Sequence, residues 1–200
     1  KLSMIKLSLF VQILLYLSPY SSGQPALTSR ICQDTFGNYT SNSAFAKNLK
    51  TLLSDITSTN TKIQYGFYNF TVGKDLDVVN GLGMCRPDLS LDDCHQCLQR
   101  ASSALVEQCP YQKDAIGWYE TCMIRYTDRN IFGKMELSPW FHQQFDVFIV
   151  NKVKFNRTAA NLLAKLQIEA ASGDSRLKYA AGTTNVSSSF EIYALLDRID

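Results

Sequence analysis

The sequence predicts an α+β domain with an antiparallel sheet, and three observations lead to this class. Two segments place apolar residues at three- and four-residue spacing, as amphipathic helices do. Each is followed by short runs rich in aromatic and β-branched residues, which favour strands. Three of the six cysteines lie within residues 85–97, at the spacing C-x8-C-x2-C. An order of helix, strands, helix, strands is typical of α+β domains.

Residues 1–23 predict a secretory signal peptide. Lys6 precedes a short apolar run over residues 7–17, and the small residues Ser21 and Gly23 stand at the −3 and −1 positions of a cleavage site. The run is shorter than the roughly 20 residues of a membrane span. The alternative is an N-terminal core helix. No second run of spanning length follows, so we expect no stable membrane insertion and secretion to the apoplast.

The charge balance points away from nucleic acid. The chain has 20 basic and 18 acidic residues, and residues 1–23 contain two lysines and no acidic residue. The remaining 18 basic residues balance the 18 acidic ones. Because nucleic acids and anionic membranes select basic surfaces, we expect neither as a partner.

The cysteines and the glycosylation motifs both fit a secreted protein. Six cysteines in a secreted chain predict three disulfides, and sequence alone leaves fifteen pairings open. Four N-x-S/T motifs predict N-glycosylation at Asn38, Asn69, Asn156 and Asn185.

The first helix is expected over residues 42–56, with Ser41 or Asn42 as its N-cap. Its apolar face comprises Phe45, Leu49, Leu52, Leu53 and Ile56. A strand is expected over residues 63–72, with Gly66 as a bulge, and another over residues 78–84.

The second helix is expected over residues 91–108. Ser90 is its predicted N-cap. Two aspartates lie in its first turn, where the helix dipole stabilises acidic side chains. Three cysteines on one face of this helix would fasten it to its surroundings. Two further strands are expected over residues 115–119 and 122–126.

The full cysteine spacing supports a resemblance to a known family. From Cys85 it reads C-x8-C-x2-C-x11-C-x12-C, with Cys32 about fifty residues earlier. Together with Gly-Trp-Tyr at 117–119 and Cys-Met-Ile-Arg-Tyr at 122–126, residues 28–133 resemble the ginkbilobin-homologous domain of plants, also called the salt-stress/antifungal domain. That domain occurs singly, or in tandem in cysteine-rich repeat secretory proteins, plasmodesmata-located proteins and cysteine-rich receptor-like kinases.

The resemblance implies two helices packed on a five-stranded antiparallel sheet. It also implies three disulfide pairs, which are Cys32–Cys109, Cys85–Cys94 and Cys97–Cys122. Ginkbilobin binds mannose through an Asn, an Arg and a Glu, and matching by cysteine position carries these onto Gln33, Ile116 and Thr127. All three residues depart from the family's sugar-binding set, so we do not expect mannose binding there.

The remainder of the chain weakly repeats the first part. We expect a linker over residues 134–154 and an incomplete second domain over residues 155–200, in which Phe155, Leu162, Leu163, Leu166 and Ile168 repeat the first helix. Residues 177–180 and 190–196 repeat two strands, and Arg198 stands where a first cysteine is expected. We expect residues 155–200 to be marginally stable unless they pack on the first domain.

Cys94-His95-Gln96-Cys97 is the one motif that suggests catalysis. A thiol–disulfide oxidoreductase uses C-x-x-C at a helix start, but also has a βαβ context, which this order of elements lacks. A zinc site would need a second pair of ligands. We therefore expect structural disulfides, His95 exposed on the helix, and no catalytic residue, metal or cofactor.

Binding is the function class that remains. We expect a secreted, non-enzymatic, cysteine-rich module of plant defence or stress signalling that recognises a carbohydrate or a protein. The alternatives are a truncated ectodomain of a cysteine-rich receptor-like kinase and, less favoured, an oxidoreductase that uses Cys94 and Cys97. Homo- or hetero-association through the sheet is a further expectation.

Overall fold

The structure is a computed structural model that describes residues 26–58, 66–134, 136, 138, 140–142, 149, 151–172 and 179–197. The expected signal peptide, residues 1–23, lies outside the described residues. The elements of the first part are β1 (Leu27–Asn38), α2 (Ala44–Ile56), β2 (Phe67–Val72), the 3₁₀ turn η1 (Asp75–Asp77), β3 (Val79–Cys85), α3 (Leu91–Gln108), β4 (Gln112–Tyr119) and β5 (Cys122–Thr127). They are followed by α4 (Lys152–Ser172), β6 (Tyr179–Ser187) and β7 (Phe190–Asp197).

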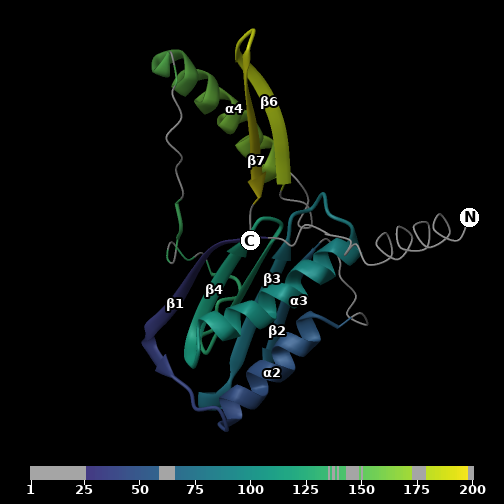
Figure 1. The fold of residues 1–200 in the computed structure, drawn as a ribbon, viewed down its shortest axis with the longest axis vertical. Coiled ribbons are helices and arrows are strands. Elements are labelled where there is room, and N and C mark those ends of the chain that lie inside the picture. Colours follow the sequence, from purple (N-terminus) through teal and green to yellow (C-terminus); the bar gives the residue numbers. More distant parts are fainter. Residues whose placement is uncertain are drawn as a thin grey trace, which may run out of the picture.

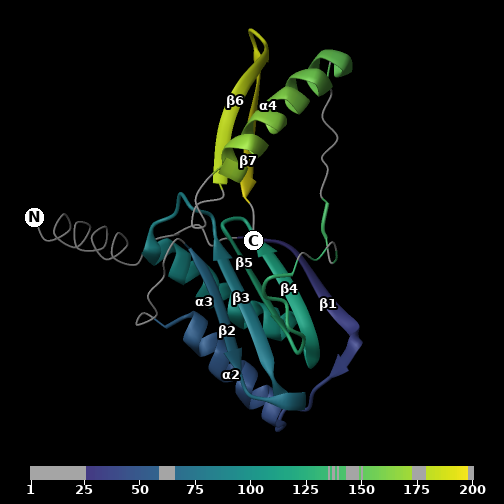
Figure 2. The same ribbon diagram turned by 180° about the vertical axis from the view of Figure 1, so that it is seen from behind.

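Five of the strands form one antiparallel sheet in the order β1-β4-β5-β3-β2. Both α2 and α3 cover the same face of this sheet, as Figures 1 and 2 show from opposite sides. We call the other side the helix-free face. The α+β class, with two helices on a five-stranded antiparallel sheet, is therefore confirmed.

Hydroxyl caps start both helices. The Ser90 Oγ accepts a hydrogen bond from the Asp93 N–H at 3.1 Å, as the sequence predicts. The cap of α2 is Ser43, whose Oγ accepts from the Ala46 N–H at 3.1 Å, so the expectation of Ser41 or Asn42 was wrong. Ser43 is held in place because its hydroxyl also donates to the Thr40 carbonyl at 2.7 Å.

Strand β1 was not predicted, and β2 begins differently from the prediction. The register of β1 against β4 shifts twice, so its side chains lack the regular alternation that identifies a strand. Gly66 lies just before β2 at a φ of +72° and is not a bulge within it. Its carbonyl accepts from the Cys85 N–H at 2.7 Å, which anchors the start of the hairpin. Residues 59–65 lie outside the described residues.

The core lies between the sheet and the two helices. Phe45, Leu52, Leu98, Leu105 and Ile124 are almost fully buried there. Gly81 on β3 allows a close approach, because a Cβ at this position would lie 2.3 Å from a methyl carbon of Leu52.

Three disulfides tie α3 to the sheet. Cys85–Cys94 joins the end of β3 to the first turn of the helix, Cys97–Cys122 joins the helix to β5, and Cys32–Cys109 joins its C-terminal end to β1. These are the three pairs that the resemblance implies. Both ends of α3 are therefore cross-linked to strands of the sheet.

The last three elements repeat the order helix, strand, strand. Helix α4 packs beside the β6–β7 hairpin (Figure 1). Its Leu162, Leu166 and Ala170 form a small separate core with Ala180 of β6. The helix begins inside the expected linker, and Ile168, expected on the apolar face, is 70% exposed. Across the described residues, none of the helices combines the length and apolar character needed to cross a membrane.

Candidate functional site

The C-x-x-C motif is structural in this fold. Cys94 and Cys97 lie in the first two turns of α3, and each is bonded to a different strand rather than to the other. Both are at most 2% exposed, and no cysteine is free. An oxidoreductase needs an accessible pair of sulfurs that can exchange one bond, so the geometry contradicts that use of this pair.

His95 differs from the expectation of an exposed helix residue. Its ring is partly buried, its Nε2 has no hydrogen-bond partner, and its centroid lies 6.5 Å from that of Tyr68. Within the described part of the chain, no group of three or more His, Cys, Asp or Glu side chains could hold a metal ion.

The three sugar-site equivalents lie on the helix-free face of adjacent strands. Gln33 of β1 is directly opposite Asp114 of β4, and Ile116 of β4 is opposite Arg125 of β5. The structure thus brings Gln33, Ile116 and Thr127 to one region of the sheet. Gln33 is partly exposed, whereas Ile116 is 5% exposed and Thr127 is fully buried.

Four charged side chains, which the sequence did not single out, surround Thr127. In this charged cluster, Asp114 accepts from Arg129 at 2.6 Å, from Thr127 at 3.1 Å and from Arg125 at 3.4 Å. Glu136 accepts from both arginines. Asp114 is fully buried and the Arg125 side chain is 8% exposed. Each of these two charges is therefore compensated by its ion-pair and hydrogen-bond partners in place of water.

The charged cluster also holds the segment after β5 against the sheet. Glu136 pairs with Arg125, and further along the segment the Phe141 ring lies 5.7 Å from the Trp118 ring of β4. The segment therefore returns over the helix-free face (Figure 2). This return explains how polar residues such as Thr127 become buried on the face without helices.

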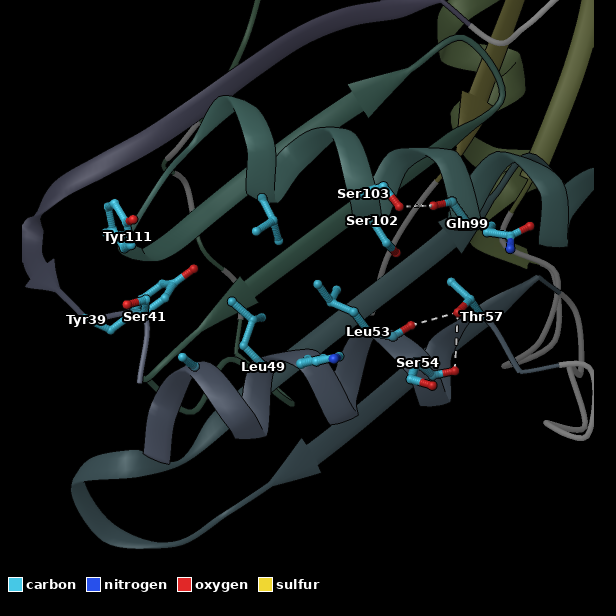
Figure 3. A pocket seen from close by; sticks show the side chains of 13 residues that line it. Tyr39, Ser41, Leu49, Leu53, Ser54, Thr57, Gln99, Ser102, Ser103 and Tyr111 are labelled. Atoms are coloured by element: carbon cyan, nitrogen blue, oxygen red, sulfur yellow. Dashed lines mark hydrogen bonds between the residues drawn. The ribbon is translucent and has the colours of Figure 1, made fainter. Parts of the chain in front are cut away.

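On the opposite side of the sheet, an open groove of about 600 Å³ separates α2 from α3 (Figure 3). The helices contact the sheet more than they contact each other, which leaves this space between them. Its apolar side chains are Ala46, Leu49, Leu53 and Val106. Its polar side chains other than tyrosine and lysine are Ser41, Ser54, Thr57, Gln99, Ser102 and Ser103.

Two tyrosines form one end of the groove. Tyr39 follows β1, Tyr111 precedes β4, and their rings meet edge to face with centroids 5.9 Å apart. Burial raises the pKa of the Tyr39 hydroxyl above its ordinary value of 10.0. Tyr111 is 50% exposed at a φ of +71°, and its carbonyl accepts from the Tyr39 N–H at 2.8 Å.

The hydroxyls of the groove differ in their bonding. Thr57 donates to the Leu53 carbonyl at 2.9 Å, and Ser103 donates to the Gln99 carbonyl at 3.3 Å. Ser102, on the side of α3 that points toward α2, is 5% exposed and its hydroxyl has no partner (Figure 3). Sequence periodicity did not reveal the groove, because Ser102 and Ser103 lie beside the apolar stripe of α3 and Thr57 lies at the end of α2, where polar residues are expected in any amphipathic helix.

All four asparagines of the N-x-S/T motifs are exposed. They lie at the end of β1 (Asn38), on β2 (Asn69), on α4 (Asn156) and on β6 (Asn185).

The fold and the cross-links define an α+β domain in which three disulfides tie one helix to an antiparallel sheet. The family model described as salt stress response/antifungal matches residues 31–129. A cysteine-rich repeat secretory protein 38 of Arabidopsis thaliana is 32% identical over 196 residues, which cover 95% of this chain and 75% of that protein. The chain belongs to the salt stress response/antifungal domain family.

Receptor-like kinases are also similar to this chain over part of their length. The Arabidopsis thaliana cysteine-rich receptor-like protein kinase 28 is 39% identical over 154 residues, which cover 76% of this chain and 22% of the kinase. The chain thus spans about a fifth of such relatives. The tandem DUF26 ectodomain of the Arabidopsis thaliana receptor-like protein PDLP8 matches with a TM-score of 0.68 at 26% identity, over 79% of this chain and 72% of that one.

Proposed function

We propose that this protein is a secreted, non-enzymatic binding module of plant defence or stress signalling, which recognises a carbohydrate or a protein. The observation that carries the proposal is the groove between α2 and α3, an open site on a frame that three disulfides hold together. Ligand sites are concave and combine apolar contact surface with polar groups that orient the ligand, as this groove does. Among its lining residues, the one charged side chain is Lys50, which favours binding over acid–base catalysis.

Secretion and glycosylation belong to the same proposal. Buried disulfides persist in oxidising compartments, and relatives of this chain are named as secretory or receptor-like proteins. The pattern over residues 1–23 supports a signal peptide, and the four exposed asparagines are accessible to modification. Mass spectrometry of the protein secreted from plant cells should find a mature N-terminus at Gln24 and glycans at these asparagines.

A second candidate function is the ligand-binding ectodomain of a receptor-like kinase. The similarity to kinase 28 over 154 residues favours it. Sequencing of full-length transcripts should then find coding sequence for a membrane span and a kinase joined to this chain. Transcripts without either would leave the secreted module as the function.

Residues 155–200 are proposed to form part of a second copy of the domain. The order of α4, β6 and β7 supports this, since it repeats that of α2, β2 and β3.

Association through the helix-free face is also a proposal, and its support is the accessible region around Phe67 and Asn69 of β2.

The proposed function is tested with the intact secreted chain. It is applied to an array of neutral and acidic glycans and, separately, to an array of plant receptor ectodomains. We expect saturable binding to at least one class. If neither array gives binding above that of the reduced and alkylated protein, the binding-module function is wrong.

A further inference from the structure

We propose that the groove between α2 and α3 binds an uncharged oligosaccharide. This inference rests on the proposed function and deepens it, because it names the ligand class and the residues that contact it. The site lies on the helix-covered side of the sheet, whereas Gln33, Ile116 and Thr127 lie on the helix-free face.

The shape of the groove fits a chain of sugar rings. Figure 3 shows it running along the two helices, from Tyr39 and Tyr111 at one end to Thr57 and Gln99 at the other. Its volume of about 600 Å³ lies in the range of small-ligand sites, roughly 300–1,000 Å³. An elongated groove that is open to solvent can take part of a longer polymer, whose remaining units continue past the ends.

The tyrosines provide the apolar contact that a sugar ring needs. A sugar presents C–H groups on its faces and hydroxyls around its edge, so it pairs with a side chain that has an apolar body and a polar tip. Tyr111 is half exposed and is fixed by its carbonyl's bond to the Tyr39 N–H. Its ring is accessible, and the edge-to-face contact with the Tyr39 ring orients it before a ligand arrives.

The unpartnered hydroxyl of Ser102 favours a polyhydroxylated ligand over an apolar peptide. A buried hydroxyl without a hydrogen bond is unfavourable. A sugar hydroxyl can both donate to it and accept from it, and the outward-facing Gln99 and Ser54 offer further polar contacts. An apolar side chain in the same place would leave the Ser102 hydroxyl without a partner.

The charge of the groove favours an uncharged sugar. Lys50 is exposed on α2, and the lining includes no carboxylate and no arginine. A single exposed ammonium contributes little to the binding of an acidic polymer. A repeating acidic saccharide would therefore find no series of positive charges along the groove.

The inference is tested by calorimetric titration of the intact chain. The probes are neutral pentasaccharides of glucose, N-acetylglucosamine and mannose, in each available linkage, with a pentasaccharide of galacturonic acid as the acidic probe. We expect at least one neutral probe to bind, and the acidic probe to bind at least tenfold more weakly. No binding of any neutral probe, or tighter binding of the acidic one, overturns the inference.

Two variants with matched controls place the ligand. Tyr111→Asn removes the ring while keeping a residue type that tolerates positive φ, and its control is Tyr193→Asn at an exposed tyrosine of β7. Ser102→Ala removes the unpartnered hydroxyl, and its control is Ser172→Ala on α4. We expect about a tenfold loss for the first and about a fivefold loss for the second, with both controls unchanged.

A further variant separates this inference from the broader function. Gln33→Ala alters the one partly exposed residue among the three sugar-site equivalents, Gln33, Ile116 and Thr127, on the helix-free face. Binding that survives both groove variants but is lost in Gln33→Ala overturns the groove site, while the binding-module function stands. If binding is found only to a protein on the ectodomain array, the oligosaccharide site in the groove is likewise overturned, while the binding-module function stands.

Discussion

At the scale of single residues, buried hydroxyls without hydrogen-bond partners occur in two settings in this fold, the main core and the groove. The hydroxyl of Tyr68 and that of Ser102 are both buried and unpaired. Tyr68 packs into the main core, whereas Ser102 lines the groove between α2 and α3. The same deficiency is therefore a cost to stability at one position and a basis for recognition at the other.

Tyr68→Phe should leave the free energy of unfolding unchanged or raise it at neutral pH, because it removes an unpaired hydroxyl. Burial raises the pKa of Tyr68 from 10.0 to about 12. Ionisation therefore favours the unfolded chain, so the free energy of unfolding falls as the pH rises from about 10, where the unfolded tyrosine ionises, toward 12. Urea unfolding at pH 8 and pH 11 should show a smaller alkaline loss in the variant. An equal loss in both proteins would contradict this assignment.

Asp114→Asn should destabilise the domain by about 3–5 kcal/mol, because it leaves the buried Arg125 guanidinium without its full complement of charge. The matched control is Asp88→Asn, which breaks an exposed pair with Arg86 and should cost about 0–1 kcal/mol. Urea midpoints at neutral pH provide the comparison. Similar losses in the two variants would show that the charged cluster contributes no more than a surface pair.

At the scale of elements, α3 is the helix to which the sheet is cross-linked. The three disulfides close loops of very different length around it, with sequence separations of 77, 9 and 25 residues. Chain-entropy arguments make the longest loop the most stabilising. Of the three disulfides, Cys32–Cys109 is therefore expected to contribute most to the free energy of unfolding.

Replacing both cysteines of one disulfide by alanine should give unequal losses. We expect about 4.5 kcal/mol for the Cys32–Cys109 pair and about 2.7 kcal/mol for the Cys85–Cys94 pair, from the lengths of the loops that they close. Each pair includes one buried cysteine at an end of α3, Cys109 at its C-cap or Cys94 in its first turn, so each variant is a control for the packing loss of the other. Guanidinium unfolding measures the difference, and a larger loss for the shorter loop would contradict the loop-length argument.

At the scale of the whole molecule, the two faces of the main sheet have different coverings. Helices and the groove occupy one face, while the segment held by Glu136 and Phe141 covers part of the other. Asn69 lies on β2 at the edge of the helix-free face, opposite Leu82 of β3. A glycan at Asn69 would therefore stand in front of the region proposed for association.

Asn69→Gln should increase self-association, because it removes this glycan from the helix-free face. Asn156→Gln on α4 removes a glycan elsewhere and is the control. Sedimentation velocity of the secreted proteins at several concentrations should show a larger concentration-dependent species for Asn69→Gln alone. Identical profiles for the two variants would argue against association through this face.

The sequence predicted the parts of the fold that depend on local patterns. The helical periodicity of residues 42–56, the cap at Ser90 and the cysteine spacing were sufficient for the two helices and, through the resemblance, for the five-stranded sheet. Strand β1 was missed because its register shifts break the alternation of its side chains. The cap of α2 was misassigned because Ser41, Asn42 and Ser43 are all capable of capping, and the chain geometry decides among them.

By itself, the sequence determined the class of fold, the two helices of the first domain and the family resemblance, because periodicity, capping residues and cysteine spacing are local or one-dimensional signals. The tertiary structure alone decided which polar side chains meet. Asp114 and Arg129 lie fifteen residues apart yet share a bond, and Ser102 faces Leu53 across a groove between two helices. Such sites depend on how helices and strands pack, and no pattern within one element records that.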